Sequence, residues 1–453
     1  MRNSKTGKES VKLRQLDRHP VLLKPGLDKL IQSLFLVALF FLVIFCWKSI
    51  QGFRFNGLSS PLFLALAAFC LILALRFRAK VRRQSFILYL LWAGWVVYVD
   101  AISGDFFVAF ARDTHWLVLP IFIKLIAELV RFQPITPHIF RLSVAFSIVL
   151  ILIGYLQNAN GVFDWSHPPL FGNIRHFGMT IGFFVVLLSG RGDADKYESA
   201  FIKVARVIGL AMLLWSGSRA PTLGWIAAVA IFLRLRTNEQ TVKSVVAESL
   251  VAAALAILFN PGDSSWVGLF NQFMRSTSST SLDEISSGRI ALWTKTIGAL
   301  LDHGQVMIGA GGNGFVRLGL YAPGPIFHPH NIFLQMLTDW GVVGLVLFFL
   351  FFWGSGVVCI THSPYGAVVV ALIGYVLISG QFDASTYHLE HLIYFSIALG
   401  ILLAEGPQVT SPSVPLKWAP ILLIFIFSTL HIYLLDYQSN WNTRYTDPHQ
   451  HRS

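Results

Sequence analysis

Long apolar blocks alternate with short polar segments along most of this chain. Two examples run from Ile31 to Trp47 and from Phe333 to Trp353, and roughly 20 apolar residues cross a bilayer as a helix. The pattern predicts helices near residues 30–47, 58–75, 85–102, 114–130, 140–157, 177–189, 201–217, 222–235, 244–259, 332–360, 365–381, 391–404 and 418–436. We therefore expect an all-α polytopic membrane protein of about 12–13 transmembrane helices.

One long connection, from Pro261 to His330, interrupts the alternation. Loops of that length in a compact protein are usually functional. Four apolar residues within it recur at helical spacing: Ile290, Trp293, Ile297 and Leu301. They predict an amphipathic helix that lies along the membrane interface or packs on the transmembrane bundle. The glycine-rich stretch 308–315 predicts a plain turn, in preference to a nest of backbone N–H groups that receives an anion.

The positions of lysine and arginine predict the orientation of the helices. Basic residues cluster in the amino-terminal tail, in residues 76–83, and around Arg131, Arg191 and Arg234, and such clusters mark cytoplasmic segments. The expected order is a basic cytoplasmic tail (1–29), a bundle of about nine helices (30–259), a large periplasmic loop (260–331), further transmembrane helices (332–436) and a polar tail (437–453).

Composition supports this interpretation and excludes others. Hydrophobic residues make up 55% of the chain and charged residues 13%, which is too apolar for soluble domains of ordinary size. The formal net charge of +12 does not indicate nucleic-acid binding, because the basic residues lie between apolar blocks. The three cysteines all lie in or beside apolar blocks, so no disulfide framework is expected.

Three short polar motifs at predicted outer boundaries are candidates for chemistry. Arg219 lies in a tight turn with Pro221 placed for the first turn of the next helix. Arg289 precedes the amphipathic segment, and His330 precedes a transmembrane helix that Asn331 is placed to cap. Taken singly, each is more typical of a residue that binds lipid headgroups or has a structural role.

Weaker candidates lie in shorter outer segments. Arg175, beside Asn173, could add a cation, and another segment holds Asp383, His388, Glu390 and His391. His328 is interpreted as structural. None of the histidines shows a metal-ligand spacing, so neither a metal nor another cofactor is expected.

Two arginines and one histidine at a single membrane face suit one kind of reaction. The planar guanidinium binds phosphate oxygens, so two arginines suit a diphosphate leaving group whose charge grows in the transition state. A histidine can orient an acceptor hydroxyl or take its proton near neutral pH.

These motifs resemble those of the O-antigen ligases and the related O-antigen polymerases. His330-Asn331, nine residues, Gly341, two residues and Gly344 match the family pattern H-[N/S/Q]-x9-G-x2-G. Arg219 to Leu223 matches its R-x3-L pattern. The helix predicted near 418–436 departs from the twelve helices usual in the family.

The resemblance implies a GT-C-type membrane glycosyltransferase of the bacterial inner membrane. Such an enzyme takes polysaccharide from undecaprenyl diphosphate at the periplasmic face. It transfers the polysaccharide to lipid A-core, with inversion and without a metal, and contacts membrane lipids. Ser287-Gly288-Arg289 followed by Trp293 is also similar to family members. By motif, Arg219 and Arg289 correspond to the diphosphate-binding residues, with Arg175 as an addition. His330 corresponds to the residue that positions or activates the acceptor, beside Asn331.

Other functions remain open on sequence. A polysaccharide polymerase or a protein O-oligosaccharyltransferase needs the same donor machinery. A lipid-carrier flippase is also polytopic, but transporters place their polar residues near the midplane and often show repeated halves, and this chain shows no repeat.

Overall fold

The computed structural model places helices over most of the predicted transmembrane blocks. It describes residues 33, 37, 80–132, 136–158, 171, 174–189, 196–235, 239–259, 267, 286–320, 328–356, 366–382, 389–405 and 413–415. The helices predicted near 30–47, 58–75 and 418–436, and both polar tails, lie outside the described residues apart from Ser33 and Val37, which are helical.

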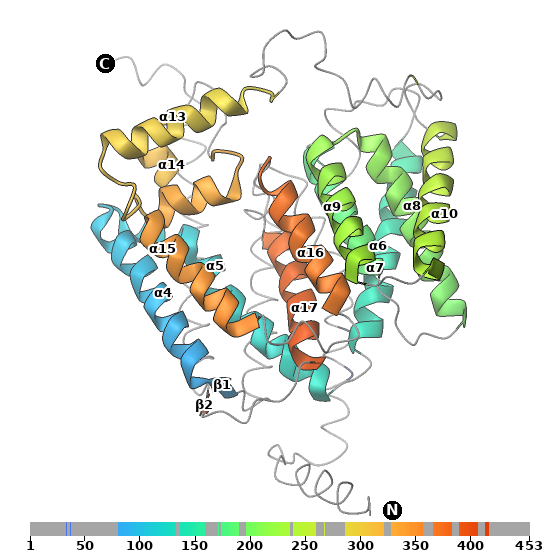
Figure 1. Ribbon diagram of the computed structural model, residues 1–453, viewed down its shortest axis with the longest axis horizontal. Coiled ribbons are helices and arrows are strands. Elements are labelled where there is room, and N and C mark those ends of the chain that lie inside the picture. Colours follow the sequence, from blue (N-terminus) through green and yellow to red (C-terminus); the bar gives the residue numbers. More distant parts are fainter. Residues whose placement is uncertain are drawn as a thin grey trace, which may run out of the picture.

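Ten described helices form the bundle (Figure 1). In chain order they are α4 (Arg83–Ile102), α5 (Phe106–Phe132), α6 (Thr136–Asn158), α7 (Ile174–Leu188), α8 (Lys196–Ser216), α9 (Arg219–Leu235), α10 (Glu239–Leu258), α15 (Ile332–Gly356), α16 (Gly366–Ser379) and α17 (Leu389–Glu405). Each coincides with one predicted block. The chain is therefore an all-α multi-pass membrane protein, as its apolar pattern predicted.

Seven of these helices fall into two groups by length and composition. Within the described residues, α4, α5, α6 and α15 are long and apolar enough to cross a membrane on their own. Shorter apolar helices occur at Ile174–Leu188, Gly366–Ser379 and His391–Ile401. Short helices of this kind keep their backbone polar groups paired internally, which a bilayer demands.

Helix α5 begins at Phe106, several residues before the boundary that the sequence predicts. Residues 112–113 lie before the helix predicted near 114–130. In the structure they are helical, and Asp113 is buried and accepts a hydrogen bond from Trp340 Nε1 at 2.9 Å. Because tertiary contacts satisfy the carboxylate, it can lie inside a helix of the bundle.

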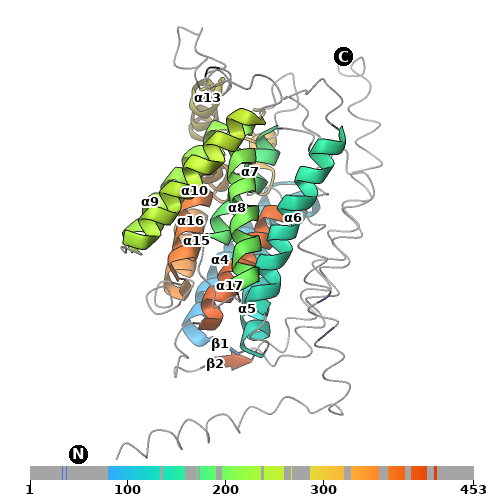
Figure 2. The same ribbon diagram turned by 90° about the vertical axis from the view of Figure 1, so that its right-hand side faces the viewer.

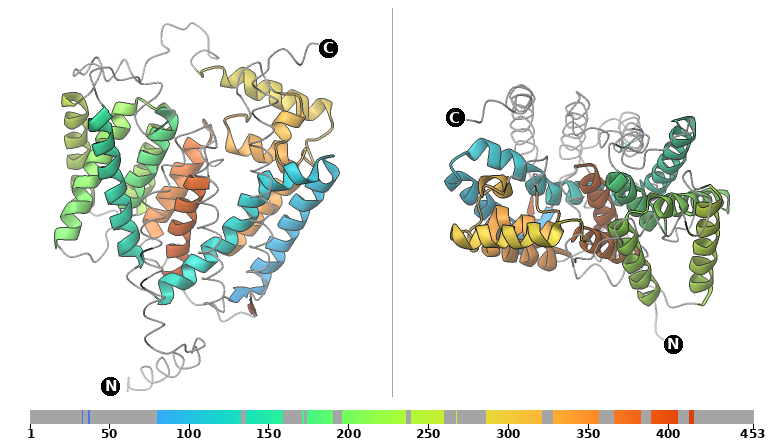
Figure 3. Two further views of the ribbon diagram at one scale, coloured as in Figure 1. Left: turned by 180° about the vertical axis from the view of Figure 1, so that it is seen from behind. Right: turned by 90° about the horizontal axis from the view of Figure 1, so that it is seen from above.

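The bundle is assembled from pairs of helices, several of which are distant in sequence. Helix α4 packs on α15, α5 on α17, α9 on α16, and α8 on both α7 and α10. Figures 1 and 3 show α4 and α15 at one side, α8 and α10 at the other, and α16 and α17 between them. One large apolar core joins these pairs.

The two ends of the bundle differ. At one end, β1 (Lys80–Arg82) pairs antiparallel with β2 (Ser413–Pro415), with Val81 opposite Val414. At the opposite end lie α13 (Arg289–Asp302) and the short α14 (Gly314–Arg317), as Figures 1 and 2 show. The described part of the predicted periplasmic loop that forms α13 and α14 therefore lies at the end of the bundle remote from β1.

Helix α13 confirms the amphipathic segment, and most of its predicted apolar stripe is exposed instead of packed on the bundle. Thr296 and Leu300 are buried, whereas Ile290, Ile297 and Leu301 are 42%, 48% and 63% exposed. A second core beneath the helix contains Leu300, Phe315, Leu318, Leu320 and Leu334. The face that packs on the protein is thus turned away from three of the four residues in the predicted stripe.

Candidate functional site

Arg219 is the first residue of α9 and follows a tight turn from α8. Gly217 has φ 55°, a left-handed conformation that glycine adopts at little cost. The Ser216 hydroxyl accepts the Ser218 N–H at 3.1 Å, and the Thr222 hydroxyl donates to the Ser218 carbonyl at 2.9 Å. Pro221 lies in the first helical turn, as predicted. These bonds fix the turn and leave the Arg219 side chain exposed.

The Arg219 guanidinium reaches the turn that precedes α13. Its Nη2 donates to Ser287 Oγ at 3.2 Å. Two residues further on, Arg289 begins α13, and its Nη1 donates to the Ser286 carbonyl at 3.0 Å. The structure therefore brings the two predicted arginine motifs together at one end of the bundle.

The third motif is joined to α13 through Trp293. The indole Nε1 of Trp293 donates to the carbonyl of Pro329 at 2.9 Å, and His330 is the next residue. The rings of His328 and His330 lie 4.2 Å apart, and the His330 N–H donates to His328 Nδ1 at 3.3 Å. His328 thus supports the loop, in keeping with the structural role predicted for it.

Asn331 caps α15, as the sequence predicted. Its Oδ1 accepts the N–H groups of Phe333 and Leu334, both at 3.0 Å, which satisfies two donors that the helix start leaves unpaired. Its Nδ2 donates to Gln381 Oε1 at 3.2 Å, at the end of α16. The cap therefore also attaches the His330 loop to α16.

Helix α15 is broken at Gly341, which has φ 66° and ψ −176°. The break removes helical partners from the carbonyls of Thr338 and Asp339. The glycine-rich loop supplies replacements, since Ala310 N–H donates to Thr338 O at 2.7 Å and Gly311 N–H to Asp339 O at 2.9 Å. The first half of α15 is thereby held against the loop that precedes it.

The same loop also binds two buried carboxylates of the protein. Gly312 N–H donates to Asp100 Oδ1 at 2.9 Å, and Gly314 N–H donates to Asp339 Oδ1 at 2.8 Å. Both aspartates are buried. The loop is thus a turn, the alternative that the sequence analysis preferred, and its amides also receive acidic side chains, which here belong to the protein itself.

Arg175 is close to the Arg219 turn because Ile174, the preceding residue, contacts that turn. The Ser218 hydroxyl donates to the carbonyl of Ile174 at 3.1 Å. Arg175 follows in the first turn of α7 and is half-buried. This contact places the start of α7 beside the start of α9.

The remaining candidates do not join this cluster in the described part of the chain. His391 is buried in α17, where its Nε2 lies 3.1 Å from Thr180 Oγ1. Asn173, Asp383 and His388 lie outside the described residues, as does the side chain of Glu390. Among the described residues, no group of three or more histidine, cysteine or acidic side chains is placed to hold a metal ion.

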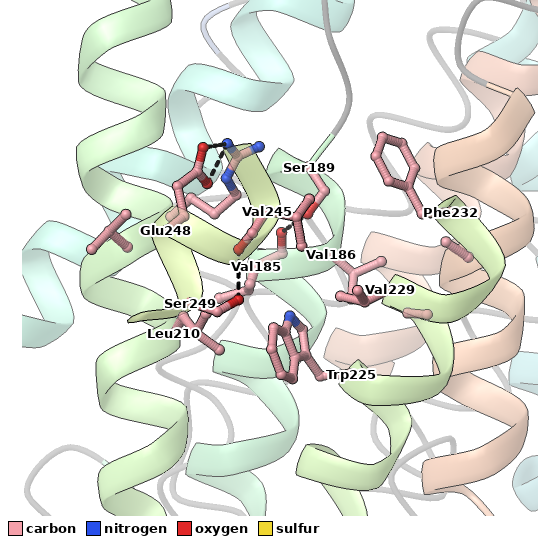
Figure 4. A pocket seen from close by; sticks show the side chains of 14 residues that line it. Val185, Val186, Ser189, Leu210, Trp225, Val229, Phe232, Val245, Glu248 and Ser249 are labelled. Atoms are coloured by element: carbon pink, nitrogen blue, oxygen red, sulfur yellow. Dashed lines mark hydrogen bonds and ion pairs between the residues drawn. The ribbon is translucent and has the colours of Figure 1, made fainter. Parts of the chain in front are cut away.

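A separate cavity lies between α7, α8, α9, α10 and α16 (Figure 4). It is lined largely by apolar side chains such as Trp225, Val229 and Phe232. On its wall, Arg206 pairs with Glu248 at 2.5 Å and donates to the carbonyl of Leu188 at 3.0 Å.

The sequence analysis did not identify this ion pair. The detectable signal was a charged residue inside each of two apolar blocks, which is uncommon in transmembrane helices. Arg206 donates to the carbonyl of Leu188, the last residue of α7. The ion pair thus satisfies a carbonyl at the end of a helix that is shorter than its neighbours. These contacts account for the presence of Arg206 and Glu248 within apolar helices.

Comparison with known families adds one finding. Residues 204–349 match the family model described as O-antigen ligase. The matched segment runs from α8 into α15 and contains Arg219, Arg289 and His330, whereas Arg175 lies before it. No curated protein matches the chain.

Proposed function

We propose that this chain transfers polysaccharide from undecaprenyl diphosphate to lipid A-core, because residues 204–349 match the O-antigen ligase family model. The reaction takes place at the periplasmic face of the bacterial inner membrane. The enzyme is a GT-C-type glycosyltransferase that inverts the anomeric centre without a metal. The family itself implies a glycosyltransferase-like membrane enzyme with a lipid-linked glycan as substrate.

The observation that supports this proposal most directly is the joining of three motifs distant in sequence. Arg219 contacts the turn that leads to Arg289, at 3.2 Å from Ser287 Oγ. Trp293, one turn after Arg289, contacts Pro329 beside His330 at 2.9 Å. Hydrogen bonds thus connect the segments that carry Arg219, Arg289 and His330 at one end of the bundle.

Each motif has a defined role in this proposal. Arg219 and Arg289 bind the diphosphate, and Arg175 extends the cationic surface from the start of α7. A charge-assisted hydrogen bond contributes about 1.5–3 kcal/mol. These bonds strengthen as charge develops on the leaving diphosphate, so they lower the barrier more than they stabilise the bound donor.

The transfer itself breaks one bond and forms another. The acceptor hydroxyl oxygen attacks the anomeric carbon from the face opposite the diphosphate. The bond between that carbon and the phosphate oxygen breaks, and its electron pair leaves with the diphosphate. His330 accepts the hydroxyl proton or orients the hydroxyl for its loss, with Asn331 fixing the start of α15 beneath it.

A polysaccharide polymerase is the second candidate function. It uses the same lipid-linked donor and differs only in its acceptor, which is another carrier-linked glycan. The residues assembled around Arg219 serve either reaction. The acceptor must therefore be identified by experiment.

The test is deletion of the gene in its host, followed by electrophoresis of lipopolysaccharide and an assay of carrier-linked glycan. A ligase leaves long polysaccharide on the lipid carrier and bare lipid A-core. Core that bears a single repeat instead identifies a polymerase. An unchanged lipopolysaccharide profile contradicts both functions and directs attention to a protein acceptor.

A further inference from the structure

Trp293 connects the two halves of the candidate site. It lies one helical turn after Arg289 on α13, and its Nε1 donates to the carbonyl of Pro329 at 2.9 Å. Its indole ring also faces the ring of Phe382, just beyond α16, with centroids 6.4 Å apart. A single side chain therefore contacts α13, the His330 loop and the end of α16.

The backbone at His330 depends on such restraints. His330 has φ 52°, in the left-handed region, where a residue with a side chain is strained by roughly 1–3 kcal/mol. Such a conformation persists only where the surrounding structure over-determines it, and it occurs often at functional sites. The contacts on both sides of His330 therefore decide whether its imidazole keeps its position.

Contacts from α16 fix the carboxyl side of His330. Asn331 Nδ2 donates to Gln381 Oε1 at 3.2 Å, and the Ile332 N–H donates to the Gly380 carbonyl at 2.8 Å. On the amino side, Trp293 holds the carbonyl of Pro329. Trp293 thus supplies the restraint that links His330 to the helix of Arg289.

We propose that Trp293 is a positioning residue that sets the separation between the diphosphate-binding arginines and His330. This inference rests on the proposed function, in which donor cleavage and removal of the acceptor proton occur in one step. Reacting groups must be aligned closely, and a displacement of about 1 Å can cost a hundredfold in rate. The Trp293 hydrogen bond acts on kcat because it orders His330 without touching the donor.

Trp293→Phe isolates this hydrogen bond, because it retains an aromatic ring and removes the N–H donor. Trp353→Phe is the matched control, since Trp353 lies near the far end of α15 and is 72% exposed. Both variants are assayed in proteoliposomes with carrier-linked polysaccharide as donor and polysaccharide-free lipid A-core as acceptor. Rates are normalised to folded protein.

A second measurement does not require transfer. Hydrogen exchange over residues 328–334 reports the order of the His330 loop directly. We expect Trp293→Phe to increase exchange in this segment, with exchange elsewhere in the bundle unchanged. Trp353→Phe should match the wild type.

The expected kinetic result is a kcat lowered roughly three- to tenfold in Trp293→Phe, as loss of one hydrogen bond implies, with the donor KM within twofold of wild type. A kcat within twofold of wild type overturns the proposal, as does a loss confined to the donor KM. If the wild type transfers nothing to lipid A-core, the proposed acceptor is wrong. In that case the exchange measurement decides the role of Trp293. Unchanged exchange over residues 328–334 in Trp293→Phe would refute the positioning role.

Discussion

Arg219 Nη2 and Ser287 Oγ lie 3.2 Å apart although 68 positions separate the two residues in sequence. Arg219 begins a helix of the bundle, and Ser287 belongs to the turn that starts α13. Their contact is one of the points at which the bundle meets the long segment between α10 and α15. The position of the Arg219 guanidinium therefore depends on the turn that leads to Arg289.

Replacing Arg219 with lysine should lower kcat/KM for transfer at least tenfold. Lysine keeps the charge but lacks the planar fork that can bind a phosphate and Ser287 together. Arg234→Lys, at the other end of α9 and also exposed, serves as the control and should retain wild-type activity. Equal activity in the two variants would remove Arg219 from the donor site.

Two substitutions of His330 separate the strain of its backbone from the proposed role of its imidazole in transfer. Both His330→Ala and His330→Gly should abolish transfer while membrane insertion stays normal. Because φ is 52° at this position, the glycine variant should be more stable than the alanine variant by about 1 kcal/mol. Thermal unfolding in detergent measures the difference. Transfer by either variant would contradict the role proposed for the imidazole.

The break in α15 should not tolerate a side chain. At Gly341, an added Cβ would collide with the backbone of Met307 and Ile308, and φ is already 66°. We expect Gly341→Ala to lower the free energy of unfolding by more than about 2 kcal/mol. It should also displace the glycine-rich loop.

Gly298→Ala is the matched control for this variant. A Cβ at Gly298, within α13, meets nothing within 4 Å, so alanine should stabilise the helix by roughly 0.5–1 kcal/mol. The midpoints of thermal unfolding should shift in opposite directions. A Gly341→Ala protein as stable as wild type would show that the break is not required.

The ion pair inside the bundle should contribute to stability and leave chemistry unaffected. Glu248→Ala leaves Arg206 without its carboxylate. Because the two side chains are 16% and 19% exposed, the expected cost is below the value of about 3–5 kcal/mol for a fully buried pair. Abundance in the membrane should fall, whereas transfer per folded molecule should not. Replacing both residues with apolar ones, Arg206→Met with Glu248→Leu, should recover much of the lost stability. Failure of the double variant to recover would indicate a role beyond pairing.

The helices were predictable because a bilayer imposes a simple rule on sequence. A crossing segment needs about 20 apolar residues with its backbone bonded internally. Local signals also identified the cap at Asn331, the helix start at Arg289 and the place of Pro221 in the first turn of α9. The boundary of α5 was misplaced because the burial of Asp113 depends on Trp340, which lies 227 positions away.

The sequence by itself therefore determined the helical membrane fold and the residue types available for chemistry. Only the tertiary structure decided which of those residues meet. Hydropathy depends on each residue and its neighbours, whereas the contacts of Arg219 with Ser287 and of Trp293 with Pro329 depend on how helices pack across the bundle. The packing face of α13 was decided in the same way, because Leu300 is buried only through the second core that α14 and α15 build beneath it.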